Sequence, residues 1–276
     1  MQQVKNLYNL AMLKSASEDG HRDPPFQSIL SVWLQTLICW MMLIPFGTVL
    51  VLLLKYFRGY RIENLKEIRC GFKMLWRESD SPLIICANHL TFIDSAIIIW
   101  ALASNPWYAL NYRAFTWNLP AGDFFKKKLR YHLTLYLTKC IFLHRDGTAA
   151  HKNAVLNLCR YLLTKRNVVL IFPEGQRSRS GLFDETRLRF GVGKIITSLN
   201  EARVLCIYLR SPQQESYSNY PPRNSRFTLK MKLIVPEIMG ATKKDASITV
   251  VRQVGSTIAV LQNEFFAENR RHIEER

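Results

Sequence analysis

The chain has 276 residues, enough to bury one substantial core, and its 48% hydrophobic and 21% charged residues exclude a disordered protein. The 38 Lys and Arg against 21 Asp and Glu give a net charge of +17, which predicts an anionic partner, either nucleic acid or acidic lipid. Because the sequence lacks zinc-finger spacing, a basic region with heptads and an aromatic ribonucleoprotein box, no nucleic-acid partner is predicted.

The first predicted element is an apolar segment at residues 33–54, just long enough to cross a bilayer as a helix. Pro45 and Gly47 interrupt it, so a kinked transmembrane helix and a helical hairpin in one leaflet are both open. A buried helix of a soluble protein is the least favoured interpretation. We therefore expect a polar segment at residues 1–27, a membrane anchor at 28–58 and a folded body at 59–276.

Charge around the anchor predicts on which side of the membrane the body lies. After the anchor, two glutamates oppose five basic residues, namely Lys55, Arg58, Arg61, Lys66 and Arg69. The first 27 residues instead carry three basic and three acidic side chains, too long and too acidic a start for a cleaved signal peptide. The positive-inside rule then places the body on the cytoplasmic face.

Beyond the anchor, strand-like and helix-like stretches alternate. Apolar runs predict strands at residues 83–87, 140–143, 168–172, 204–209 and 227–235. Apolar stretches of helical length predict helices at residues 94–102 and at about 248–266, and helical spacing of apolar residues predicts one at about 148–165. A polar, Pro-rich loop is expected at residues 212–226. This order predicts an α/β fold with a mixed central sheet flanked by helices, preceded by the membrane-embedded helical segment.

Asn88, His89 and Asp94 directly follow the first predicted strand. On a continuous helix the five-residue offset from His89 to Asp94 is a rotation of about 140°, so only a turn before the helix would let the carboxylate reach back. In that geometry Asp94 fixes the imidazole tautomer, and the other ring nitrogen can accept a substrate proton. Alternatively, His89 is a loop residue and Asp94 a helix N-cap. The spacing alone leaves this second interpretation slightly ahead.

A second polar segment, at residues 173–181, begins where the strand at 168–172 ends. Gly175 lets the backbone approach a ligand closely, Arg177 can make paired hydrogen bonds to phosphate, and Ser178 can add a neutral donor. These residue types after a strand suit an oxyanion. The alternative is a solvated basic turn, which we keep for Arg179.

The two segments, in this order and about eighty residues apart, resemble motifs of the glycerolipid acyltransferase family, in particular the 1-acyl-sn-glycerol-3-phosphate (lysophosphatidate) acyltransferases. Asn88, His89 and Asp94 match the first family motif. The third is matched by Phe172, Pro173, Glu174, Gly175, Arg177 and Ser178, with Gln176 where Thr is commoner. The resemblance covers roughly residues 83–209 and implies a catalytic His89–Asp94 pair.

The same resemblance implies substrate-binding residues: Asn88, Arg145, Glu174, Gly175, Arg177 and Ser178. Arg145 is taken from residues 141–145, which look like the second family motif, as a second phosphate contact beside Arg177. Two departures concern the rest of the pattern. The strand at 204–209 lacks the proline of the fourth motif, and Gly191 stands where many members have a Lys that Lys194 could replace. Residues 188–194 are also similar to tafazzin-type transacylases.

The implied reaction is acyl transfer from acyl-CoA or acyl carrier protein to the free hydroxyl of a lysophospholipid, with 1-acylglycerol-3-phosphate, giving phosphatidic acid, as the first candidate. Alternatives are transacylation between phospholipids, another lysolipid acceptor, and, from a different class, a non-catalytic membrane protein that binds acidic lipids. The sequence has no Gly-x-Ser-x-Gly elbow for a serine hydrolase and no His and carboxylate cluster with metal-ligand spacing. We expect no metal and no cofactor beyond the acyl donor as co-substrate.

Overall fold

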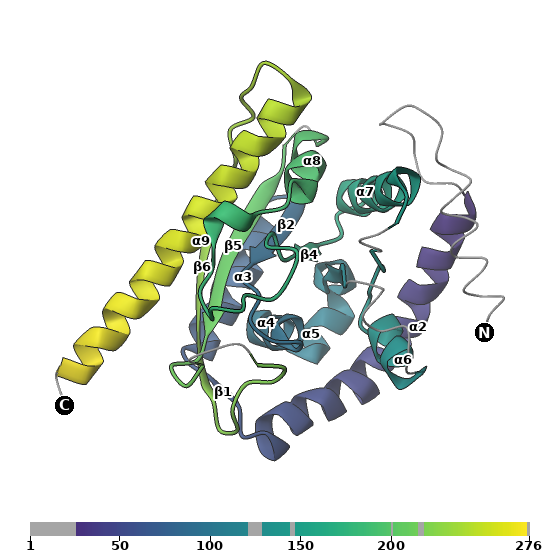
Figure 1. The fold of residues 1–276 in the computed structure, drawn as a ribbon. Coiled ribbons are helices and arrows are strands. Elements are labelled where there is room, and N and C mark those ends of the chain that lie inside the picture. Colours follow the sequence, from purple (N-terminus) through teal and green to yellow (C-terminus); the bar gives the residue numbers. More distant parts are fainter. Residues whose placement is uncertain (1–25, 121–128, 144–146, 200, 215–217, 275–276) are drawn as a thin grey trace.

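The computed structural model describes residues 26–120, 129–143, 147–199, 201–214 and 218–274. Within them, six strands form one mixed sheet in the order β1-β6-β5-β2-β4-β3. Figure 1 shows the fold. Neighbouring strands are parallel except β5 and β6, which are antiparallel. The strands are β1 (Arg61–Ile62), β2 (Leu83–Ala87), β3 (Trp117–Asn118), β4 (Val169–Ile171), β5 (Arg203–Arg210) and β6 (Arg226–Ile234).

Helices cover both faces of this sheet, which confirms the predicted α/β class. The helices after the anchor segment are α3 (Leu65–Glu78), α4 (Asp94–Leu102), α5 (Asn105–Leu110), α6 (Leu129–Leu137), α7 (Ala149–Thr164), α8 (Gly191–Thr197) and α9 (Lys243–Glu274), with short 3-10 turns η2 (Tyr112–Ala114) and η4 (Glu185–Arg187). One core lies between the sheet and α7, α8 and α9, and a second lies between the sheet and α3, α4 and α5.

The central strand β2 explains how the two cores are divided. All five of its residues are buried: Ile84 and Cys86 belong to the first core, and Leu83, Ile85 and Ala87 to the second. Successive side chains of a strand point to opposite faces of the sheet, and here helices cover both faces. A parallel strand in this position is therefore a continuous apolar run. The polar residues that follow β2 therefore leave the core at the carboxyl edge of the sheet.

The apolar N-terminal segment is one helix, α2 (Phe26–Leu52), which continues as a π-helical turn, η1 (Leu53–Phe57). Pro45 lies inside α2, and the chain does not reverse there. Residues Ser28–Phe57 are long and apolar enough to cross a membrane, which supports membrane association of the protein. In Figure 1, α2 runs along one flank of the body toward β1.

Most predicted elements occur where expected, and the differences have local causes. Residues 140–143, predicted as a strand, form no strand of their own. They lie beside β3, where Cys140 makes an isolated β-bridge with Asn118 and Leu143 N–H donates to Pro120 O at 3.1 Å. The last helix begins earlier than predicted, because Thr242 and Asp245 form a reciprocal capping box, with Thr242 N–H and Asp245 N–H each donating across 3.2 Å.

Candidate active site

Asn88 fixes the turn that leaves β2. Its amide oxygen accepts a hydrogen bond from Leu209 N–H at 2.7 Å, and its amide NH2 donates to Leu209 O at 3.0 Å. The side chain thus pairs with the end of β5 as another peptide group would. It is almost fully buried, so His89 begins from a rigid position.

His89 and Asp94 are in direct contact. His89 Nδ1 lies 3.0 Å from Asp94 Oδ2, and the same carboxylate oxygen accepts N–H bonds from Leu90 at 2.6 Å and Thr91 at 2.7 Å. The prediction that Asp94 is a helix N-cap is wrong: Ile93 holds that position, and Asp94 is the first residue of α4. Because the turn at residues 90–93 directs the carboxylate back to the ring, the proton of the neutral imidazole belongs on Nδ1, and Nε2 remains for a substrate.

Phe172, at the end of β4, holds the imidazole ring from one side. The two rings are stacked, with centroids 4.0 Å apart and an interplanar angle of 14°. Together with the bond to Asp94, this contact leaves the ring little freedom to rotate. The His89 side chain is 21% exposed and that of Asp94 only 4%, so the histidine is the member of the pair that a ligand can reach.

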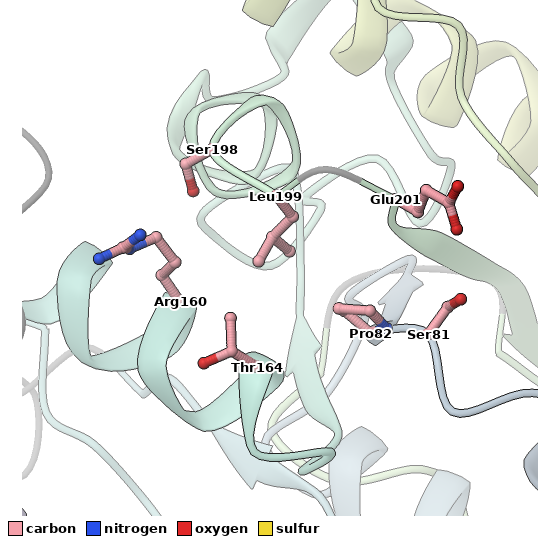
Figure 2. A pocket seen from close by; sticks show the side chains of 7 residues that line it. All are labelled: Ser81, Pro82, Arg160, Thr164, Ser198, Leu199 and Glu201. Carbon is pink, nitrogen blue, oxygen red and sulfur yellow. The ribbon is translucent and has the colours of Figure 1, made fainter.

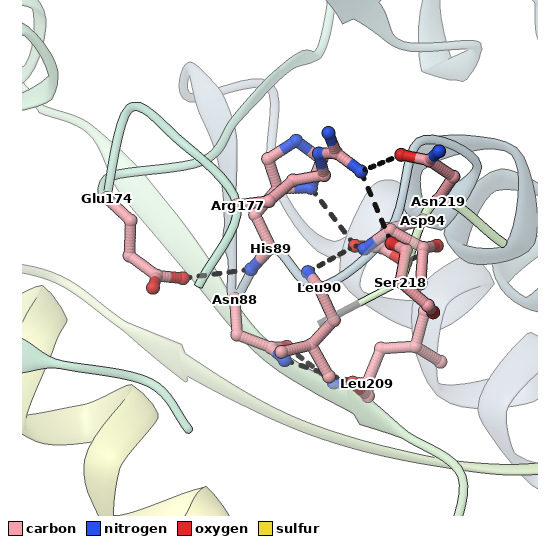
Figure 3. A network of polar contacts seen from close by, with 10 residues as sticks. Asn88, His89, Leu90, Asp94, Glu174, Arg177, Leu209, Ser218 and Asn219 are labelled. Atoms are coloured by element: carbon pink, nitrogen blue, oxygen red, sulfur yellow. Dashed lines mark hydrogen bonds and ion pairs between the residues drawn. The ribbon is translucent and has the colours of Figure 1, made fainter. Parts of the chain in front are cut away.

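The loop after β4 holds the backbone of His89. Glu174 Oε1 accepts a bond from His89 N–H at 2.9 Å, and Ser178 N–H donates to His89 O at 2.8 Å. Gly175 makes the intervening turn at φ +66°, where a Cβ would also stand 2.7 Å from Arg189 Cγ. The two polar segments found in the sequence therefore form one site, drawn in Figure 3.

Glu174 is a buried carboxyl group. Burial raises its pKa to about 8, and the negative charges of Asp94 and Asp184 act in the same direction, whereas the bond from His89 N–H opposes them. A large share of the Glu174 side chains is therefore protonated at neutral pH. Such a group supports the loop as an uncharged hydrogen-bonding side chain.

Arg177 extends from the same loop across the first motif. Its guanidinium lies over the Phe92 ring, 3.6 Å from the centroid, and its Nη1 donates to Asn219 Oδ1 at 2.9 Å and to Ser218 O at 3.2 Å. Figure 3 shows these bonds to the chain that connects β5 and β6. The side chain is half-buried, and a planar guanidinium held in this way is suited to a phosphate.

The remaining predicted site residues have different positions. The Ser178 hydroxyl donates to Leu182 O at 2.5 Å and lies 3.1 Å from Ser180 Oγ, so here it holds the turn. Arg145 lies outside the described residues. The structure brings Asn88, His89, Asp94, Glu174, Gly175, Arg177 and Ser178 together at one edge of the sheet.

Three further residues contribute to the site although the sequence analysis gave them no role. Phe172 stacks on His89, Phe92 carries the guanidinium of Arg177, and Asn219 orients it. The two phenylalanines lie inside the motifs, and an aromatic residue within a catalytic motif is the signal that could have identified them. Asn219 lies in the irregular loop after β5, where no periodicity points to a partner.

An open cavity of about 600 Å³ among the described residues lies elsewhere. Figure 2 shows its lining, which comes from α7 (Arg160, Thr164), from the segment after α8 (Ser198, Leu199) and from the residues before β2 (Ser81, Pro82). Ser81 and Pro82 directly precede β2 and His89 lies beyond its other end, so the length of β2 separates this side of the cavity from the His89–Asp94 pair. In the described ranges no group of three or more His, Cys, Asp or Glu side chains could hold a metal ion.

A histidine paired with a carboxylate, beside an arginine loop at the carboxyl edge of a mixed α/β sheet, is an arrangement suited to activating a substrate hydroxyl group. A family model described as Acyltransferase matches residues 59–210, which is more than half of the chain and includes both motif segments of the site. The chain therefore belongs to the acyltransferase family, the glycerolipid acyltransferase family that contains the lysophosphatidate acyltransferases. No curated protein matches the chain. Membership supports acyl transfer to glycerolipids, with a lipid acceptor and an acyl donor as substrates.

Proposed function

We propose that the protein is an O-acyltransferase that moves an acyl group from acyl-CoA or acyl carrier protein to the free hydroxyl of 1-acylglycerol-3-phosphate, giving phosphatidic acid. The observation that supports it is the contact between His89 and Asp94, 3.0 Å from Nδ1 to Oδ2, in a chain of this family. It leaves Nε2 as the base for a hydroxyl group. No protein nucleophile is needed, because the acceptor supplies the attacking oxygen.

In the proposed reaction, Nε2 of His89 takes the hydroxyl proton as the oxygen attacks the thioester carbon. A new C–O bond gives a tetrahedral intermediate, which collapses when the C–S bond breaks, and the departing thiolate recovers the proton from the imidazolium. Asp94 keeps the ring oriented and stabilises its positive charge. General-base catalysis supplies on the order of 10² to 10⁴ in rate, so positioning of the two substrates must supply much of the rest.

We assign the acceptor phosphate to Arg177, with Arg145 as a second contact. Arg177 is held by Asn219 and Ser218 and adjoins the loop that fixes His89, which supports this assignment. Asn88 and Glu174 bond to the backbone of the site, and we propose that both act by positioning His89. We place the body on the cytoplasmic face, because Lys55 and Arg58 at the end of the apolar helix suit an acidic leaflet.

The test is a purified, reconstituted protein offered a mixed panel of lysolipids and acyl donors, with the products analysed by mass spectrometry. We expect phosphatidic acid that appears only when a thioester is present, and its loss in His89→Ala. Product formed from a phospholipid donor without any thioester would instead establish transacylation. Undiminished acyl transfer by His89→Ala would contradict the proposed base.

A further inference from the structure

One side of α2 faces protein along nearly its whole length. Its buried residues recur every three or four positions at Ser28, Val32, Gln35, Cys39 and Leu43, and Leu54 follows in η1. Residues spaced in this way lie on one face of a helix. Leu50 and Val51, partly buried, pack against the second core and continue the face between Leu43 and Leu54. A helix surrounded by lipid would have no such face.

The contacts on this face come from several parts of the body. Near the start of α2, Gln35 Nε2 donates to Tyr136 O at 3.0 Å and to Cys140 O at 3.3 Å. In the middle, Trp40 Nε1 donates to Ala109 O at 3.1 Å. Further on, a Cβ on Gly47 would stand 3.1 Å from the amide nitrogen of Asn105, so α2 and α5 touch there. Figure 1 shows the same course of α2 along the flank of the body, past α6 and α5.

The length of this contact is incompatible with an upright crossing of the membrane. From Gln35 to Leu54 the helix rises about 29 Å, the thickness of the hydrocarbon layer of a bilayer. An upright α2 would carry the adjoining body into that layer. The segment that contacts the middle of α2 at Trp40 and Cys39 comprises the end of α5 and the residues after it. It has irregular backbone at Asn111 and an exposed charged side chain at Arg113. Lipid-exposed irregular backbone does not occur in the hydrocarbon region, and charged side chains there are costly.

The opposite side of α2 is an exposed apolar surface with a basic end. Trp33, Leu37, Met41, Ile44 and Leu52 are all more than a third exposed, and Leu110 of the neighbouring α5 is 87% exposed. Soluble monomeric proteins rarely expose a continuous apolar patch of this extent. At the end of η1, Lys55 lies over the Tyr56 ring at 5.0 Å, and Arg223 lies over the Phe57 ring at 5.2 Å. Aromatic and basic side chains together suit the head groups of acidic phospholipids.

We propose that α2 lies in the plane of the membrane, with this outer face embedded in a single leaflet of acidic phospholipid and the catalytic body resting on the same leaflet. The arrangement brings the site to the lipid. Arg58 and Tyr60, at the end of η1, both donate to Pro221 O, at 2.6 and 2.9 Å. Asn219, two residues before Pro221, holds Arg177, the residue assigned to the acceptor phosphate. The loop at residues 219–221 therefore connects Arg177 to the end of the embedded helix.

Spin labels on α2 test this orientation directly. The full chain carries Cys70→Ser, because Cys70 is the exposed cysteine among six, and one of Trp33→Cys, Leu37→Cys, Ile44→Cys or Leu52→Cys. Each labelled protein is reconstituted in phosphatidylcholine vesicles with about one third phosphatidylglycerol, and depth is measured by oxygen and nickel-chelate accessibility. We expect all four labels at similar depth in one leaflet. The control Ser256→Cys, on the exposed side of α9, should report water.

Two results would overturn the proposal. A profile that is deepest at Ile44 and shallow at Trp33 and Leu52, with those two ends reachable from opposite sides of sealed vesicles, would show a transmembrane helix. Strong dipolar broadening with low oxygen access would show that a second copy of the chain covers the face. Neither result bears on His89, so the reaction is tested separately.

A second variant removes the apolar face without touching the site. Replacing Leu37, Met41 and Ile44 together by Gln should release the protein from the vesicles in a flotation assay. Val260→Gln, which changes an equally exposed apolar residue on α9, should remain bound. Full retention of the triple variant, with its circular dichroism unchanged, would contradict an embedded outer face.

Discussion

His89 is held by contacts that act on different parts of the residue. Asp94 bonds to Nδ1, Phe172 stacks on the ring, and Glu174 and Ser178 bond to the backbone N–H and C=O. Each contact uses a residue from one of the two motifs. If His89 is the proposed base, a ring held in this way loses little entropy when the acceptor binds, which is the physical advantage of holding it from two loops.

Asp94→Asn tests the proposed division of roles within the pair. The amide keeps the shape of the side chain but can present its NH2 to His89, favouring the wrong tautomer, and it no longer stabilises the imidazolium. We expect kcat to fall by about 10² to 10⁴ while the KM for the acyl donor changes little. Glu201→Gln, on the exposed segment before β5, is the control and should retain activity. An Asp94→Asn enzyme with normal kcat would show that Asp94 only supports the turn.

Glu174→Gln tests the buried carboxyl group through the pH dependence of stability. Because burial raises the pKa of Glu174 from 4.5 to about 8, the folded protein binds this proton more tightly than the unfolded chain. The stability that it contributes is full below about pH 4.5 and is lost as the pH rises toward about 8, by up to about 1.4 kcal/mol per pH unit. The thermal midpoint of the wild type should therefore fall relative to that of Glu174→Gln over this range. Both proteins are measured in detergent. If their thermal midpoints change in parallel with pH, the raised pKa of Glu174 is contradicted.

The elements that could be predicted from the sequence are those with a strong local pattern. Residues 83–87 and 94–102 match β2 and α4, because one is a continuous apolar run and the other an apolar stretch of helical length after a turn. The two-residue strands β1 and β3 were missed, since pairing with distant β6 and β4 defines them. For the site, the motifs predicted the contact of His89 with Asp94. The link from Arg177 to Asn219 spans 42 residues of sequence and is visible only in the fold.

The connection between β5 and β6 holds the Arg177 guanidinium in position through hydrogen bonds to Ser218 and Asn219. Asn219→Ala removes the acceptor at 2.9 Å from Arg177 Nη1, so the guanidinium becomes less well positioned for the phosphate. We expect the KM for the lysolipid to rise by about three- to tenfold, with kcat and the KM for the donor nearly unchanged. The matched control is Ser218→Ala, because Ser218 contacts Arg177 through its carbonyl and its hydroxyl donates instead to Tyr220 O. Equal effects of the two variants would point to general loosening of the loop.

At the level of the complete protein, the apolar helix and the catalytic site are joined by one continuous set of contacts. Arg58 at the end of η1 donates to Pro221 O, and Asn219 in the same loop holds Arg177. Residues that act through one shared loop should have non-additive effects, whereas distant independent residues should not. The structure therefore predicts energetic coupling between the C-terminal end of this helix and the proposed binding of the acceptor at Arg177.

A double-mutant cycle with Arg58→Gln and Asn219→Ala measures this coupling in the KM for the lysolipid. If the loop transmits the constraint, Arg58→Gln alone raises that KM, and adding Asn219→Ala then changes it much less than it does in the wild type, a coupling of about 0.5 to 3 kcal/mol. Lys73→Gln serves as the matched control, because Lys73 lies on α3 and its ammonium group packs over the Trp107 ring of α5. Its effect should add to that of Asn219→Ala. Additive effects of Arg58→Gln and Asn219→Ala would mean that the helix end and Arg177 act independently, and the loop would then be a passive connection between β5 and β6.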